Sequence, residues 1–276
     1  MRHLTAVIAS VIGFGAVVAS GPLVAGDSQV PGGPIEKLQV TRANTNIPLP
    51  IGIEADVYCS GWIGDMEESF PGSIRSAEYV DSQYSFTSGD IVYLDIGSDR
   101  GAAPGQEYWI VRPGEPVNEH GSVSRYAGRM YSTSGRVRII CVQEESAIAE
   151  ITFACADTIL GDKILPFEPI PVPLVRRTKP YTSCDPPSGK VGGHIIAARD
   201  GVVPIGTETI VFLDLGEDDG LNPGDFLTVY RGRADVAGLR TILGEAAVLM
   251  TRGRNCVAKI TWMRDVMETG DSVELK

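Results

Sequence analysis

The sequence predicts an all-β protein: two tandem small antiparallel β-barrel or β-sandwich modules that follow an N-terminal signal peptide. The first observation is an internal repeat, since the segment Ile91–Gly105 returns, with substitutions, as Ile210–Gly224, and such repeats mark duplicated structural units. The second is the high content of glycine (32) and proline (18), which is typical of many turns between short strands. The third is the weakness of helix signals, because the best candidate, 63–76, is interrupted by two glycines and a proline.

The N-terminus has the pattern of a secretory signal peptide, which we predict at residues 1–25. Arg2 precedes a stretch without charged residues that ends in small residues suited to cleavage. An uncleaved membrane anchor is the alternative, although glycines and Pro22 interrupt the apolar stretch. We therefore expect a bacterial protein of the periplasm or the extracellular space, whose mature chain does not span the membrane.

Composition divides the rest of the chain. Residues 26–50 are rich in glycine, proline and small polar residues and are expected to form a flexible lead-in. A first β-module is predicted at 51–165 and a second at 181–276. Between them, 166–180 is rich in proline, which favours an extended, semi-rigid linker because proline cannot donate ladder hydrogen bonds.

The repeated part of each module begins with a strand and a glycine-rich turn. Residues 90–95 are dense in β-branched and aromatic residues, so we expect a strand that pairs with 106–112 across the turn. At least one residue of the turn is expected at positive φ, and a longer loop is expected at 113–134. The predicted structural residues of the two turns are Gly97, Gly101, Pro104, Gly105, Gly216, Gly220, Pro223 and Gly224.

A second hairpin follows in each module. In the first copy, strands are expected at 136–142 and 147–155, where apolar residues of one parity indicate the buried face. Each module then ends in a Gly-Asp turn and a short closing strand, at 163–165 or 272–275. The pattern predicts roughly five to seven strands in each module.

Five cysteines in an exported chain are typical of disulfide bonding. Cys184–Cys256 is the bridge predicted within the second module. In the first module Cys59 is expected to pair with Cys155 or with Cys141, which leaves one thiol free. Five buried thiols are the alternative. No cysteine has the spacing of a metal ligand.

Charge excludes one class of partner and raises the question of metal binding. The net charge of -11 repels phosphate backbones, so nucleic acid is not an expected partner. Acidic residues cluster in the repeated turn, and calcium prefers several oxygens from one short segment. Their spacing does not match the twelve-residue calcium loop, whereas aspartate beside glycine commonly caps turns. We therefore expect structural turns, with no metal and no cofactor. The acidic residues concerned are Asp95, Asp99, Asp214, Asp218 and Asp219.

Catalytic signatures are scarce. Beyond the signal peptide the only histidines are His120, in the predicted long loop, and His194, at the start of a predicted strand. No serine has the nucleophile-elbow spacing, and metalloprotease and phosphate-loop motifs are absent. We expect a non-enzyme, with a hydrolase whose serine, histidine and aspartate come from distant positions as a remote alternative.

Aromatic residues and arginines concentrate around the predicted long loop of the first module. Exposed rings stack on sugar faces, and a local basic patch attracts anionic groups. We therefore predict a candidate interaction surface for a glycan or a protein partner. It consists of Trp62, Arg125, Tyr126, Arg129 and Tyr131.

The repeated pattern is Val-x-Leu-Asp-x-Gly-x-x-x-Gly-x-x-Pro-Gly, followed by a strand that ends in arginine and later by Gly-Asp-x-Ile/Val. Over residues 74–165 and 193–275 it resembles the small C-terminal β-domain of the flagellar assembly protein T family. Similar modules occur in exported bacterial envelope proteins, some of which carry LysM domains. This chain has no LysM-like segment and lacks the other parts of the flagellar family. The resemblance implies a non-catalytic envelope protein, a structural or adaptor module that binds proteins; a peptidoglycan- or glycan-binding module is the alternative.

Overall fold

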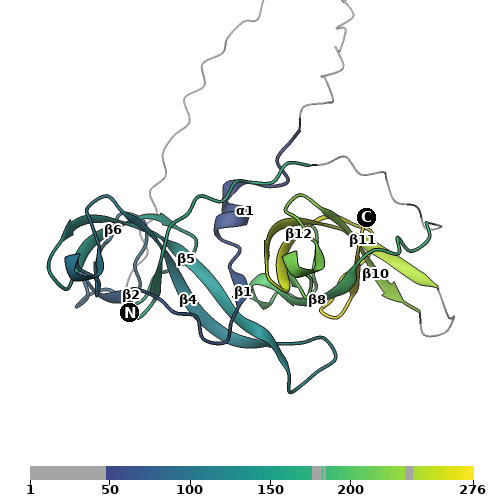
Figure 1. Ribbon diagram of the computed structural model, residues 1–276, viewed down its shortest axis with the longest axis horizontal. Helices are drawn as coiled ribbons and strands as arrows, with labels where there is room; N and C mark the ends of the chain where they lie inside the picture. The colour runs from purple at the N-terminus through teal and green to yellow at the C-terminus, as the bar shows by residue number, and fades with distance from the viewer. Residues whose placement is uncertain (1–47, 176–181, 183–184, 234–238) are drawn as a thin grey trace, which may run out of the picture. The chain divides into compact units, whose positions relative to one another are not determined.

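The computed structural model describes residues 48–175, 182, 185–233 and 239–276. The predicted signal peptide and nearly all of the predicted lead-in lie outside these residues. The described chain folds into two closed antiparallel β-barrels of six strands each (Figure 1). The all-β class and the two tandem modules predicted from the repeat are therefore confirmed.

The first barrel closes when β6 pairs with β5, and the order around it is β5-β4-β7-β2-β3-β6. A short additional strand, β1, pairs with β5 outside this ring. All pairings are antiparallel, as expected for strands joined by short turns. The strands are β1 (Trp62–Gly64), β2 (Gly72–Ala77), β3 (Ile91–Leu94), β4 (Glu107–Asn118), β5 (Tyr126–Val142), β6 (Ala147–Ala154) and β7 (Lys163–Pro166).

The second barrel repeats this topology strand for strand. Its order is β11-β10-β13-β8-β9-β12, and β12 pairs with β11 to close the ring. Closure removes the free strand edges that an open sheet would expose. The strands are β8 (Gly192–Ala198), β9 (Ile210–Leu213), β10 (Phe226–Gly232), β11 (Arg240–Arg252), β12 (Asn255–Met263) and β13 (Ser272–Leu275).

Each barrel has its own apolar core, made of the inward-facing residues of its strands. The alternation of buried and exposed positions along a strand places these residues on one face of the sheet. Val92 of β3 and Val211 of β9 occupy equivalent core positions, and both are completely buried. Duplication has thus preserved the interior of the fold.

The repeated turn after β3 and β9 is built on glycines. A Cβ atom on Gly97 would collide with the backbone carbonyl of Glu144 in the facing turn, so no larger residue fits there. Gly101 then ends a short 3-10 turn, η1 (Ser98–Arg100), with φ of 79°, a left-handed conformation that favours glycine. The second copy has the same arrangement around η3 (Glu217–Asp219).

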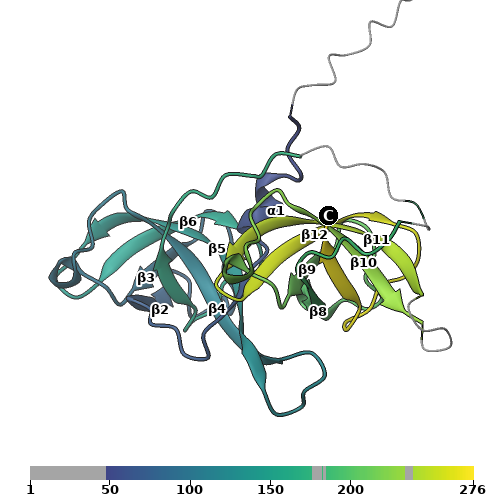
Figure 2. The same cartoon turned by 45° about the vertical axis from the view of Figure 1, so that its right-hand side comes forward.

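One region differs from the prediction. Residues 113–134 do not form a long loop, because β4 and β5 continue past the barrel as a long paired hairpin, here called the arm (Figure 2). The segment 63–76, whose helix signal was weak, is not helical and contains most of β1 and most of β2. The helix lies just before it, at α1 (Glu54–Tyr58). Across the described ranges, no helix combines the length and the apolar character needed to cross a membrane.

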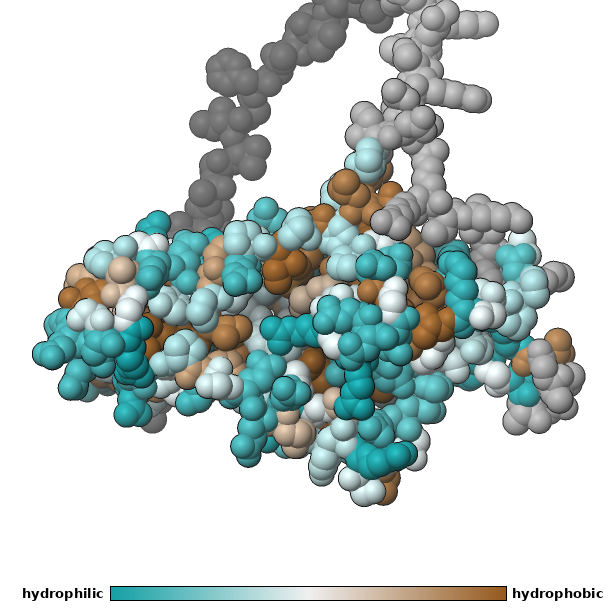
Figure 3. All heavy atoms as spheres, viewed as in Figure 1, coloured by the Kyte–Doolittle hydropathy of each residue, from teal (hydrophilic) through white to brown (hydrophobic). Residues whose placement is uncertain are grey.

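A shared apolar cluster lies on the outer face of the second barrel. Phe212 and Leu249 of that barrel pack there with Val57 of α1 and Ile63 of β1, and both segments lie between the barrels in Figure 1. Hydrophobic residues gather around α1 in the surface view as well (Figure 3). Burial of such side chains stabilises the contact by roughly 1.5–3 kcal/mol each.

The predicted linker contributes to the same cluster. Val172 packs against it, and the backbone N–H of Ile51 donates to the carbonyl of Pro173 at 2.9 Å. Residues 167–173 have no regular secondary structure, which agrees with the extended conformation expected of a proline-rich segment. The part of the linker at 176–180 lies outside the described residues.

One disulfide is present in the described part of the chain. Cys59 bonds to Cys155, which is one of the two pairings expected for the first module, and Cys141 is an exposed free thiol. The predicted Cys184–Cys256 bridge is not formed, because Cys256 is a buried free thiol. Cys256 lies in the core of the second barrel, while Cys184 lies outside the described residues.

Candidate functional site

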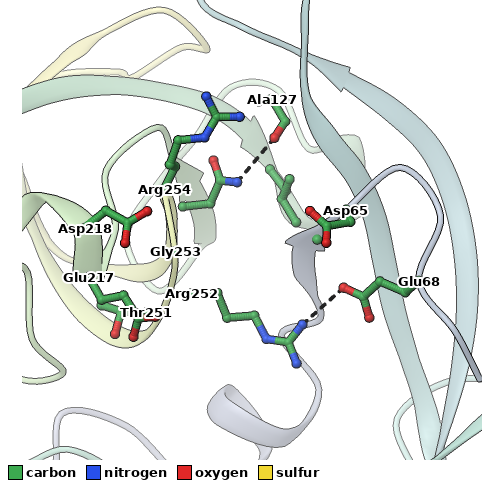
Figure 4. A pocket seen from close by; sticks show the side chains of 12 residues that line it. Asp65, Glu68, Ala127, Glu217, Asp218, Thr251, Arg252, Gly253 and Arg254 are labelled. Atoms are coloured by element: carbon green, nitrogen blue, oxygen red, sulfur yellow. Dashed lines mark hydrogen bonds and ion pairs between the residues drawn. The ribbon is translucent and has the colours of Figure 1, made fainter.

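A cleft with a cavity volume of about 610 Å³ is the main candidate site (Figure 4). One wall comes from β1 and the segment that follows it, and the other comes from two turns of the second barrel. Charged side chains dominate the lining. They are Asp65, Glu68, Glu217, Asp218, Arg252 and Arg254.

The second-barrel wall is formed because two turns contact each other. The backbone N–H of Asp218, in η3, donates to the carbonyl of Gly253, in the β11–β12 turn, at 3.0 Å. Gly216 is the required residue before η3, since any Cβ there would collide with the same carbonyl. The repeated glycine turn therefore carries Glu217 and Asp218 to the cleft, opposite Asp65 in Figure 4.

Arg252 spans the cleft from the second barrel to the first. Its guanidinium lies 3.2 Å from the carboxylate of Glu68 and 4.5 Å from the centre of the Trp62 ring. The indole N–H of Trp62 donates to the same carboxylate at 3.0 Å. This combination of ion pair and cation–π contact orders the floor of the cleft.

The remaining carboxylates of the cleft are not held by an ion pair of this kind. Asp65, Glu217 and Asp218 are exposed, and none forms an ion pair with another residue in the described ranges. Their three negative charges exceed the one positive charge of Arg254, so the cleft is negatively charged. The cleft is thus chemically suited to contact cationic side chains of a partner.

A smaller pocket of about 270 Å³ adjoins the cleft and shares Arg254 and Asn255 with it. At its wall the ring of His120, from the tip of the arm, stacks on the ring of His194, from β8, at 3.8 Å and 11°. The Nδ1 atom of His194 lies 3.3 Å from a carboxylate oxygen of Asp214. The sequence placed the two histidines in separate modules and offered no signal that they meet.

Asp214 has the same structural role as its counterpart in the first barrel. Asp95 accepts the backbone N–H and the hydroxyl of Ser73, and Asp214 accepts the backbone N–H of His194. His194 therefore stands where the first barrel has a serine, and the aspartate joins two strands in both copies. Serine, threonine and cysteine are absent from the residues that line the histidine pocket, so no hydroxyl or thiol nucleophile stands beside this pair there.

One of the acidic residues of the repeated turn, Asp219, caps that turn. Asp219 accepts the backbone N–H of Gly216 at 2.9 Å, which is the geometry expected of aspartate beside glycine. Within the described residues, no group of three histidine, cysteine, aspartate or glutamate side chains is arranged to hold a metal ion. These contacts support the turn interpretation over the calcium loop.

Sequence reasoning missed the strongest polar contact of the repeat. Arg112 donates two hydrogen bonds, at 2.8 and 2.7 Å, to Asp162 of the Gly-Asp turn. Arg231 and Asp271 form the same bidentate pair, at 2.6 and 2.8 Å. Hydrogen bonding to the aspartate raises the pKa of each arginine. The arginine and the Gly-Asp motif were both visible as repeated residues, but their recurrence alone did not show that they are partners.

The predicted interaction surface is only partly exposed. Trp62 and Tyr131 are buried, and their rings stack with centroids 5.6 Å apart. The guanidinium of Arg129 donates to the backbone carbonyls of Met66, after β1, and of Gly114, in β4. Trp62 and Tyr131 cannot form an exposed row of rings, because β1 pairs with β5 in the arm and the two side chains are buried there. Arg125 and Tyr126 are exposed at the tip of the arm.

No family model matches this chain, and no curated protein matches it either.

Proposed function

We propose that this chain is an exported, non-catalytic protein of the bacterial cell envelope that acts as a structural or adaptor module through protein–protein contacts. One observation carries the proposal: the repeated arginines, the aspartates of the Gly-Asp turns and the aspartates after β3 and β9 bond within the barrels. The arginine–aspartate pairs lock each Gly-Asp turn to a strand, and the aspartates after β3 and β9 join neighbouring strands. Duplication has preserved residues that hold the fold.

The cysteine chemistry supports the proposed compartment. The Cys59–Cys155 disulfide is typical of proteins that fold outside the reducing cytosol. Together with the N-terminal segment predicted as a signal peptide, it supports export to the periplasm or beyond.

The exposed elements indicate where a partner would bind. Closed barrels leave few strand edges for pairing, so we assign the contact to the cleft walls and to the tip of the arm. Tyr126 is 48% exposed at that tip, and Arg125 beside it forms an ion pair with Glu119 at 3.2 Å. A partner with cationic side chains for the cleft and an apolar or aromatic patch for Tyr126 fits this surface.

The resemblance to envelope modules supports the same role, and membership of the flagellar family stays a proposal. Glycan binding has less support, because stacking on sugars needs exposed rings and the rings of Trp62 and Tyr131 are buried. No observation in the described residues favours a hydrolase over the adaptor role.

Site-specific photo-crosslinking in intact cells tests the proposal. A photoreactive phenylalanine derivative at Tyr126 is expected to capture one envelope protein, and Asp218→Lys is expected to reduce the yield of that adduct. The matched control is the same substitution at Tyr84, which is 94% exposed and lies outside both the cleft and the arm. Equal adducts from both positions would contradict the proposal, as would sedimentation of the purified protein with peptidoglycan in the absence of any partner.

A further inference from the structure

We propose that the Cys59–Cys155 disulfide is a thiol–disulfide exchange site that a dithiol reductant reaches in the folded protein. The disulfide lines a cavity of about 320 Å³, and both cysteines are only partly buried. A disulfide sealed in a core exchanges only after unfolding, whereas an accessible one reacts directly. The cavity is distinct from the cleft and the histidine pocket.

The two cysteines connect different parts of the molecule. Cys59 directly follows α1 as its C-cap, and its backbone N–H donates to the carbonyl of Ala55. Cys155 lies just after β6 and donates its N–H to Ser134 of β5. The bridge therefore joins α1 directly to the wall of the first barrel.

The cavity is polar and its rim is charged. Ser132 and Thr133 line it together with Asp56 of α1, and the second barrel contributes Arg199 and Asp200. The last two form an ion pair at 3.3 Å. The two carboxylates outnumber this one cation, and an attacking thiolate is an anion. Arg199 offsets part of the negative charge of the lining, so its removal leaves a cavity that disfavours an anionic thiol more strongly.

The exchange balances with a dithiol as co-reactant. One thiolate of the dithiol attacks a sulfur of the bridge, forms a mixed disulfide and expels the other cysteine as a thiolate, which takes up a proton. The second thiol of the reductant loses its proton, attacks the mixed disulfide and releases the first cysteine. The protein gains two thiols, and the dithiol is oxidised to a disulfide.

Reduction changes how α1 is held. On the second barrel, Asp56 pairs with Lys259 at 2.8 Å, and Val57 packs into the apolar cluster. On the first barrel, the ring of Tyr58 packs against Trp109 of β4, with ring centroids 5.1 Å apart. Reduction therefore removes the covalent link between α1 and the wall of the first barrel and leaves these non-covalent contacts to hold α1.

Native-state reduction kinetics test the proposal. The oxidised full chain is mixed with dithiothreitol at several concentrations, quenched by alkylation, and analysed by peptide mass spectrometry for Cys59 and Cys155. We expect the reduction rate to rise linearly with dithiothreitol and to be insensitive to low urea. A rate that does not depend on dithiothreitol, and that rises with urea, would mean that reduction requires unfolding and would overturn the proposal.

Two variants test the route of access. Ala156 is exposed and lines the cavity, so Ala156→Trp is expected to slow reduction by about tenfold through steric exclusion. The matched control is Ala103→Trp, in an exposed turn of the same barrel, which is expected to leave the rate unchanged. Equal rates in the two variants would overturn the proposal.

Arg199→Ala keeps the test decisive if the tryptophan variant folds poorly. Removal of the cation is expected to slow reduction by the anionic thiol mercaptoethanesulfonate several-fold, and to slow reduction by the cationic thiol cysteamine less. The same change for both thiols would contradict entry through this cavity.

Discussion

The bidentate arginine–aspartate pair of the second barrel allows a quantitative test of the claim that the repeated residues serve the fold. Asp271 is nearly inaccessible, with 4% of its side chain exposed. It accepts two hydrogen bonds from Arg231 and one, at 2.7 Å, from the backbone N–H of Glu268. Asp271→Ala removes all three acceptor contacts and leaves the backbone donor of Glu268 without its partner.

The expected loss follows from burial on the two sides of the pair. Breaking a buried ion pair costs about 3–5 kcal/mol when the surviving charge stays buried. Arg231 is 45% exposed, so its guanidinium regains water, and the loss falls at the lower end of this range. We therefore expect Asp271→Ala to lower the free energy of unfolding by about 3 kcal/mol.

Urea unfolding followed by far-UV circular dichroism measures this loss. Asp162→Ala in the first barrel is the matched variant and is expected to behave alike, because Asp162 makes the same bidentate pair and is equally buried. Asp218→Ala is the control, since Asp218 is exposed and unpaired among the described residues, and surface changes of this kind fall within about 0.5 kcal/mol. A loss below about 1 kcal/mol for Asp271→Ala, indistinguishable from the control, would refute the reasoning.

Three further outcomes are expected. Glu208 has φ of 67° where the first barrel has a glycine, and its carboxylate, which is 70% exposed, pairs with the buried Lys259. Lys259 keeps Asp56 as its other partner, at 2.8 Å, so backbone strain of about 1–3 kcal/mol is expected to exceed the loss of the Glu208 pair. Glu208→Gly should therefore raise the urea midpoint, and a lower midpoint would contradict this. Burial raises the pKa of Asp56, but hydrogen bonds from Lys259 and the backbone outweigh it and leave the pKa below its ordinary 3.8. The stability that separates the native protein from Asp56→Asn should therefore be present at pH 6 and disappear as the pH falls through and below 3.8; a pH-independent difference in urea unfolding would exclude this. Burial raises the pKa of the Cys256 thiol, so alkylation of the folded protein at pH 8 should modify Cys141 and spare Cys256 in peptide mass spectrometry, and equal labelling would show that the core opens.

Several parts of the fold were predictable because their cause is local. Glycines at positive φ, prolines that cannot donate and alternating apolar residues act over a few neighbouring positions. The turn from Gly97 to Gly105 and the strands on either side of it therefore follow from the residues they contain. The repeat then transfers the same argument to the second barrel.

The arm shows where local reasoning ends. Its sequence at 113–134 contains prolines and glycines and resembles a loop, yet β4 and β5 stay paired there, with irregular register at three places. Pairing continues because β1 adds to β5 on one side and the second barrel covers part of the arm through Val117 and Ala127. Burial against distant segments outweighs the weak strand propensity of these residues.

The fold class, the duplication and the glycine turns were thus readable from the chain, since backbone preferences and residue periodicity act between near neighbours. The sequence did not show which distant residues contact each other. Cys59 bonds to Cys155, Arg231 pairs with Asp271, and His120 stacks on His194, all across long sequence separations. Such pairs depend on which barrel faces meet in space. The three-dimensional arrangement alone decided that Trp62 is enclosed instead of exposed, and that unpaired carboxylates from both barrels border one cleft.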